Sequence, residues 1–139
     1  MNDAPTVLFL CTHNAGRSQL GSHLFRHVAG DRAHATSAGT APADGPSQPV
    51  VQALAELGID SSGAQPRAVT ADDLATADIV VAMKPGLQLP GPVAGQFVQW
   101  AFPDPASWDL DGVRELRDTI LVQVEELVGV GRARTRMIQ

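Results

Sequence analysis

Residues 6–19 read TVLFLCTHNAGRSQ, and this stretch decides the fold. Its first part, Thr6–Leu10, is a continuous apolar run, which is typical of a strand buried on both faces in a parallel sheet. A loop of small residues follows at 11–16. Over Arg17–Ala29 the apolar residues recur at helical spacing, and Gly30 is a stop signal. A buried strand therefore leads directly into a helix.

Strand and helix patterns alternate along the rest of the chain. We expect strands near 33–37, 78–83 and 97–100, and helices over 50–57, 71–75 and 113–128. Thr70, with Asp73 three positions later, forms a variant of the capping box for the 71–75 helix. This alternation predicts an α/β fold of three layers with a central, mainly parallel four-stranded sheet. The whole chain, 1–139, is short enough to form a single domain.

The composition indicates a globular protein with an acidic balance. Hydrophobic residues make up 44% of the 139 residues and charged residues 18%, so we expect a packed core. The net charge is -5 with a single lysine, which argues against nucleic-acid binding because phosphates need a basic face. No stretch approaches the ~18 apolar residues of a membrane span, and no secretory signal pattern is visible. We expect a cytoplasmic protein without nucleic-acid or membrane partners.

The loop before the first helix combines an anion-binding site with a nucleophile. Successive backbone N–H groups in such a loop point inward, and the helix N-terminus adds partial positive charge. Arg17 adds a planar fork of donors suited to a tetrahedral oxyanion. Cys11, the only cysteine, lies at the mouth of this cradle, where the field favours its thiolate and Ser18 can donate a hydrogen bond. The expected oxyanion-binding residues are Thr12, His13, Asn14, Ala15, Gly16, Arg17 and Ser18.

Some candidate residues also have a purely structural interpretation. Cys11 would suit a strand end as a small buried side chain. Asp104 stands between two prolines in a rigid loop, which suits a general acid that protonates the leaving oxygen. An aspartate there would equally cap the segment that follows. His13 lies inside the loop, where it would face solvent or contact a cosubstrate.

We expect neither a metal site nor a bound cofactor. His23 and His27 lie one helical turn apart, a spacing that can bind a metal. The sequence shows no third ligand near them. Both are therefore expected to be surface or partly packed histidines.

Residues 7–19 resemble the oxyanion loop of low-molecular-weight protein tyrosine phosphatases and, more closely, that of the arsenate reductases with the same fold. The likeness covers nearly the whole chain and continues in order at Ser37–Thr40, Gly58–Asp60, Asp78–Met83 and Asp104–Ala106. It implies the three-layer fold of that family for this chain.

The resemblance also assigns roles to particular residues. It implies that Cys11 is the nucleophile and that Arg17 and the loop amides bind the oxyanion. Asn14 would organise the loop, Ser18 would assist the thiolate, and Asp104 would be the general acid. These roles agree with those suggested by the chemistry of the loop.

The residue after Asp104-Pro105 bears on the choice between phosphatase and reductase. Phosphatases that act on phosphotyrosine usually carry an aromatic residue there, whereas this chain has Ala106 and no tyrosine. A phenyl phosphate would find little to stack on. This favours the reductases, although Trp108 could replace the missing aromatic wall.

The cysteine count bears on the source of electrons. Thioredoxin-coupled reductases of this fold carry two further cysteines in the loop after the 78–83 strand, whereas this chain has only Cys11. We therefore expect arsenate reduction through a cysteinyl–arsenate adduct, with mycothiol or glutathione as an external thiol. The expected protein partner is glutaredoxin-like or mycoredoxin-like. The alternatives are a phosphatase that hydrolyses phosphate monoesters through cysteinyl phosphate, and an oxyanion-binding or regulatory domain without turnover.

Overall fold

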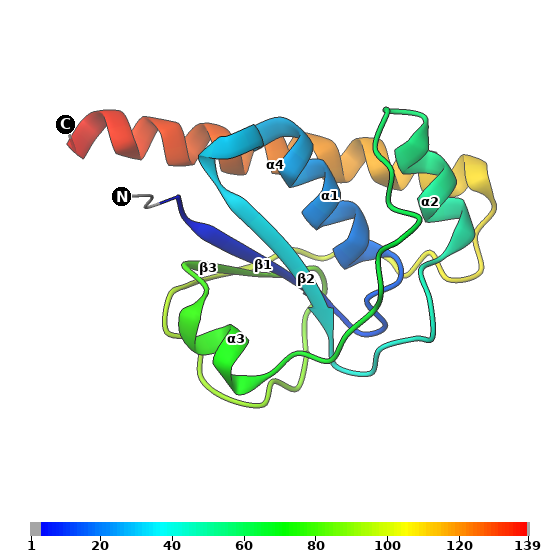
Figure 1. Cartoon of the computed structure of the whole chain (residues 1–139), viewed down its shortest axis with the longest axis horizontal. Helices are drawn as coiled ribbons and strands as arrows, with labels where there is room; N and C mark the ends of the chain where they lie inside the picture. Colours follow the sequence, from blue (N-terminus) through cyan, green and yellow to red (C-terminus); the bar gives the residue numbers. More distant parts are fainter. Residues whose placement is uncertain (1–3, 139) are drawn as a thin grey trace.

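The computed structural model describes residues 4–138, and residues 130–138 are described as helical backbone only. The strands are β1 (Thr6–Cys11), β2 (His34–Gly39), β3 (Ile79–Ala82) and β4 (Gln96–Gln99). The helices are α1 (Arg17–Ala29), the 3₁₀ helix η1 (Gly30–Arg32), α2 (Gln48–Ala55), α3 (Ala71–Thr76) and α4 (Leu110–Ile138). Strands and helices follow one another along the chain, except that η1 comes directly after α1, and that two helices, α2 and α3, and two strands, β3 and β4, are consecutive (Figure 1).

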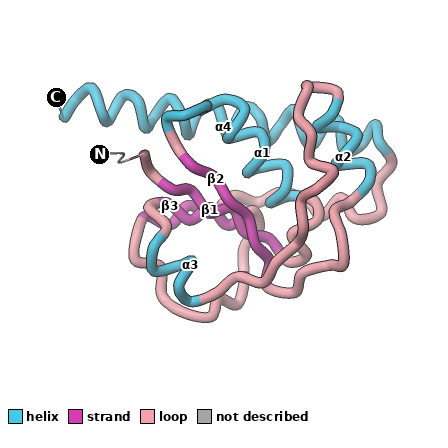
Figure 2. The backbone as a smooth tube through the Cα atoms, in the orientation of Figure 1, coloured by secondary structure: helices cyan, strands magenta, loops and turns pink. Residues whose placement is uncertain are grey.

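The strands form one parallel sheet in the order β2-β1-β3-β4. Figure 2 shows β2, β1 and β3 of this sheet in magenta. β1 is an interior strand, and Leu10 pairs with Ala38 on one side and with Ala82 on the other. This arrangement confirms the predicted α/β fold with a parallel four-stranded sheet. It also places Cys11 at the carboxyl end of an interior strand, the position at which ligands bind in open α/β sheets.

Helices cover both faces of the sheet and so produce three layers (Figure 1). Side chains alternate along β1, and Phe9 packs in the larger hydrophobic cluster with the buried faces of α1, α2 and α4. Leu8 and Leu10 face the opposite way. They pack in the smaller cluster with Leu74 of α3. The continuous apolar run of β1 therefore serves two cores at once.

The predicted elements are all present, but several boundaries differ. α2 begins before the predicted 50–57 range because Pro49 is accommodated in its first turn. α4 extends on both sides of the predicted 113–128 helix. Among the side chains that the structure describes, the buried face of α4 runs from Val113 to Val128, which is the range that the hydrophobic periodicity predicts. The predicted capping box of α3 is confirmed, since Thr70 and Asp73 exchange side-chain-to-backbone hydrogen bonds.

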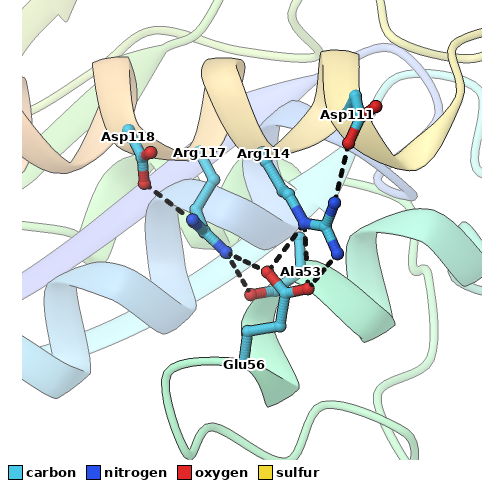
Figure 3. A network of polar contacts seen from close by, with 6 residues as sticks. All are labelled: Ala53, Glu56, Asp111, Arg114, Arg117 and Asp118. Atoms are coloured by element: carbon cyan, nitrogen blue, oxygen red, sulfur yellow. Dashed lines mark hydrogen bonds and ion pairs between the residues drawn. The ribbon is translucent and has the colours of Figure 1, made fainter.

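An ion-pair network joins α2 to α4 (Figure 3). The carboxylate of Glu56 lies 2.6 Å from the guanidinium of Arg114 and 2.7 Å from that of Arg117. Asp111 and Asp118 hold these two arginines from the other side. Arg117 also donates to the carbonyl of Ala53, near the end of α2. The network fixes the helix that follows the segment 40–47.

None of the helices within residues 4–138 is long and apolar enough to cross a membrane.

The packing of α1 on the sheet leaves no room for a side chain at Gly21. A Cβ there would lie 2.6 Å from the ring of Phe9, which is wholly buried. We expect Gly21→Ala to lower the free energy of unfolding by about 1–3 kcal/mol, because the ring must shift. Gly129→Ala is the control, since a Cβ at this helical position has open space. It should stabilise by at most about 1 kcal/mol. Equal effects in urea denaturation would contradict this packing.

The network around Glu56 predicts a pH dependence of stability. Hydrogen bonds from Arg114 and then Arg117 lower the pKa of Glu56 from 4.5 to about 2. Its stabilising contribution is therefore complete above pH 4.5 and is lost as the pH falls towards 2. Glu56→Gln should remove this part of the acid-induced loss of stability, measured by urea denaturation from pH 7 to pH 2. Glu125→Gln, at an exposed position of α4, should leave the acid-induced loss of stability unchanged. If the free energy of unfolding depended on pH in the same way for Glu56→Gln and the unaltered chain, Glu56 would not be the source of this pH dependence.

Candidate active site

The loop between β1 and α1 has every backbone carbonyl from Cys11 to Gly16 held by a hydrogen bond. The N–H groups of Thr40, Ala41, Ala43 and Ser47 donate to the carbonyls of Cys11, Thr12, His13 and Ala15, at distances of 3.2, 2.8, 2.9 and 3.1 Å. Gln19 Nε2 donates to Asn14, and the N–H of Leu20 donates to Gly16, both at 2.9 Å.

The hydrogen bonds to these carbonyls determine the direction in which the backbone N–H groups of the loop point. In a trans peptide the N–H is directed opposite to the carbonyl. The N–H groups of residues 12–17 therefore point away from the segment 40–47 and from Gln19. Within the described residues, none of these N–H groups donates a hydrogen bond to another part of the chain. Such a run of free N–H groups before a helix has the form of an anion-binding nest.

Cys11 lies beside this nest and is almost completely buried, with 2% of its surface exposed. Its Sγ is 3.0 Å from the Oγ of Ser18. Asn14 Nδ2 donates to the same Oγ at 2.7 Å. Because the hydroxyl oxygen accepts from Asn14, its own proton is free to point at the sulfur. Ser18 is therefore the donor in its contact with Cys11, an arrangement that suits a thiolate.

Asn14 is the centre of the loop and has a backbone φ of 53°. Asparagine is one of the few residues that tolerate this left-handed conformation. Its side chain is wholly buried, and its Oδ1 accepts from the backbone N–H of Arg67 at 3.0 Å. Since that N–H can only donate, the amide is fixed with its Nδ2 towards Ser18. The backbone of Arg67 thus sets the direction of the hydrogen bond to the sulfur.

The loop that carries Asp104 packs against the oxyanion loop. Arg17, 6% exposed, donates from its Nη1 to the carbonyl of Phe102 at 2.9 Å. A Cβ on Gly16 would lie 3.1 Å from Pro105. Asp104 itself is exposed, and its Oδ1 accepts from the N–H of Ala106 at 3.1 Å. The structure therefore brings the two loops together. The carboxylate of Asp104 caps the segment that follows it, which is the structural interpretation that the sequence also allowed.

The remaining candidate residues differ in exposure. His13 is exposed, whereas Thr12, Ala15 and Gly16 are half-buried. Trp108 packs against the larger hydrophobic cluster. Within the described residues, no group of three or more His, Cys, Asp or Glu side chains could hold a metal ion.

Three residues of this site were not predicted from the sequence. Gly39, at the end of β2, approaches the loop so closely that a Cβ would lie 2.5 Å from the carbonyl oxygen of Thr12. Gln19 and Arg67 hold Asn14 from two sides. Gln19 directly follows Ser18 in a helix that the apolar pattern predicts to be buried on one face, but nothing in the sequence marks its side chain as a donor to the loop.

Comparison with known proteins agrees with this geometry. The family model for low molecular weight phosphotyrosine protein phosphatases matches residues 6–88, which include β1, the oxyanion loop and β3. The chain belongs to this family. The resemblance of residues 7–19 to low-molecular-weight phosphatases, and to arsenate reductases of the same fold, is thereby confirmed.

Arsenate reductases are among the relatives of this low-molecular-weight phosphatase family member. Arsenate reductase 1 of Staphylococcus epidermidis is 32% identical over 123 residues, which cover 86% of this chain and 92% of that protein. The structure of the Archaeoglobus fulgidus arsenate reductase is 31% identical, with a TM-score of 0.76, and the match covers 88% of this chain and 98% of that chain.

A second solved structure is that of a thioredoxin-dependent arsenate reductase from Corynebacterium glutamicum. It is 31% identical, with a TM-score of 0.75. The match covers 91% of this chain and 63% of that chain, so this chain spans less than two thirds of that protein.

The close approach of Gly39 to the loop makes a prediction about anion binding. Gly39→Ala should displace the carbonyl of Thr12 and with it the N–H groups that it orients. We expect the Kd for arsenate, measured by isothermal titration calorimetry, to rise about tenfold or more. Gly45→Ala is the matched control, because a Cβ there meets nothing within 4 Å. Unchanged arsenate binding by a folded Gly39→Ala variant would rule out this role of the glycine.

Proposed function

We propose that this chain is an enzyme that reduces arsenate to arsenite through a cysteinyl–arsenate adduct on Cys11. The observation that carries the proposal is the placement of the only cysteine beside a run of backbone N–H groups that make no hydrogen bond within the described residues, with Ser18 donating towards its sulfur. The similarity to arsenate reductases over most of the chain supports arsenate as the oxyanion. The proposed reaction is cytoplasmic and needs no bound cofactor or metal.

The first step is a substitution at arsenic. Arsenate is held by the N–H groups of residues 12–17 and by the donors of Arg17 that the bond to Phe102 leaves free. The thiolate of Cys11 attacks arsenic, so that a sulfur–arsenic bond forms and an arsenic–oxygen bond breaks. Asp104 supplies a proton, and the oxygen leaves as water. Arsenic remains As(V) in this adduct.

The second stage supplies two electrons from outside the chain. A low-molecular-weight thiolate, from mycothiol or glutathione, attacks arsenic and displaces the thiolate of Cys11, which is thereby regenerated. A redoxin thiolate then attacks the sulfur of this conjugate. The electron pair of the sulfur–arsenic bond stays on arsenic, which leaves as arsenite, and the two thiols are left as a mixed disulfide. Cys11 is neither oxidised nor reduced, which fits a chain with one cysteine.

The thioredoxin-dependent structural relative supports a redoxin as the partner. We propose an external low-molecular-weight thiol, mycothiol or glutathione, as the donor because the chain has no second thiol with which to form a disulfide of its own.

Hydrolysis of phosphate monoesters would share the first step, with phosphorus in place of arsenic. Ala106 stands next to the Asp104-Pro105 pair, and the nearby Trp108 is half-buried and packs against the larger hydrophobic cluster. Neither supports stacking of a phenyl ring at the site. These observations favour arsenate over an aryl phosphate.

The proposal is tested on purified protein with Cys11→Ser as the control. We expect arsenite to form from arsenate with mycothiol and mycoredoxin, or with glutathione and glutaredoxin, and formation to be abolished by Cys11→Ser. Asp104→Asn should slow formation by about 10²-fold or more, the range for loss of a general acid. Hydrolysis of p-nitrophenyl phosphate without arsenite would identify a phosphatase. Arsenate binding with neither activity would identify a binding domain.

A further inference from the structure

One peptide of the oxyanion loop depends on a side chain for its orientation. The carbonyls of Cys11, Thr12, His13 and Ala15 are held by backbone N–H groups of the segment 40–47. The carbonyl of Asn14 is held instead by Nε2 of Gln19, at 2.9 Å. The same peptide carries the N–H of Ala15, which points the opposite way. The contacts that orient the side chain of Gln19 therefore also determine the direction of the Ala15 N–H.

Gln19 is oriented by a second side chain, His23, one turn further along α1. Gln19 is 2% exposed, and its Oε1 lies 3.1 Å from Nε2 of His23. The Nη2 of Arg26 lies 3.3 Å from Nδ1 of the same ring. A guanidinium can only donate, so Nδ1 accepts and the ring proton lies on Nε2. Nε2 then donates to Oε1 of Gln19, which leaves the amide Nε2 of Gln19 facing Asn14.

The hydrogen bonds from Arg26 to His23, from His23 to Gln19 and from Gln19 to Asn14 form a relay. The direction in which these groups donate affects how the loop would bind an anion. A reversed Gln19 amide would place its oxygen against the carbonyl oxygen of Asn14, and the two would repel. The Asn14–Ala15 peptide would then be free to rotate and turn its carbonyl towards the bound oxyanion. Burial, together with the charge of Arg26, lowers the pKa of His23 to about 4. The ring is therefore neutral near pH 7, which leaves Nδ1 free to accept from Arg26.

We propose that Gln19 and His23 are positioning residues of the oxyanion loop: they hold the Asn14 carbonyl outward and so direct the N–H of Ala15 at the anion. Neither residue touches the anion itself. His27, the other histidine of α1, is exposed and takes no part in this chain of hydrogen bonds. The two histidines that share a metal-like spacing thus differ in role.

This inference rests on the proposed function only in that the loop binds an oxyanion. It concerns anion affinity, which is measured without thiol or redoxin. If the unaltered chain binds arsenate and forms no arsenite, the proposed reaction fails and the positioning role stands. If it binds neither arsenate nor inorganic phosphate, the positioning role fails with it.

The test compares Gln19→Leu, His23→Leu, His23→Gln and His27→Leu with the unaltered chain. The Kd values for arsenate and for inorganic phosphate are measured by calorimetry at pH 7.5, and Tm reports folding. We expect Gln19→Leu and His23→Leu to raise both Kd values by about tenfold, the effect of one lost aligned donor. His23→Gln should restore most of the affinity, because its amide can donate to Gln19. His27→Leu should leave both Kd values within about twofold.

Two results would overturn the inference. One is a folded His23→Leu variant whose anion affinity equals that of His27→Leu. The other is a His23→Gln variant that is as weak as His23→Leu, which would show that the donor is not what matters. If Gln19→Leu does not fold, the two His23 variants and the His27 control decide the question. In the variants that fold, kcat/KM for arsenate should fall mainly through KM.

Discussion

The site depends on one constraint, which is that the carbonyls of the loop after β1 are already bound by the protein. Unsatisfied backbone groups are costly to bury, and here the carbonyl half of each peptide is satisfied while the N–H half is left free. For the oxyanion that we propose as its ligand, the loop is therefore ordered before binding. Little reorganisation is needed at the moment of binding, which is the condition under which fixed dipoles stabilise charge most effectively.

The rest of the fold supports this constraint from several sides. β1 delivers the loop at the carboxyl end of an interior strand, and α1 begins immediately after it. The segment 40–47 supplies the donors and then continues into α2, which the Glu56 network fastens to α4. An ion-pair network far from Cys11 in sequence thus helps to keep the donors of the loop in place. Its carboxylate is partly exposed, so its contribution is smaller than that of the buried contacts.

The sequence predicted the architecture well because the strongest patterns were also the most buried elements. The run at Thr6–Leu10 and the helix over Arg17–Ala29 are both present with closely similar limits. The sequence also predicted that Cys11, Asn14 and Ser18 lie together, since all three belong to the short stretch in which β1 leads into α1. Contacts between distant segments could not be predicted. The backbone N–H of Arg67 and the missing Cβ of Gly39 act through geometry that no local pattern encodes. The end of α4 was missed because the apolar periodicity of the sequence stops at Val128, and residues 129–136 are mostly glycine and arginine with few apolar positions.

The burial of Cys11 has a consequence for its chemical lifetime. The side chain belongs to the larger hydrophobic cluster and exposes 2% of its surface. Oxidation of a cysteine follows its exposure as well as its thiolate character. A bulky oxidant therefore meets a sulfur that is almost wholly covered. Burial thus limits the access of oxidants to the single thiol of the chain.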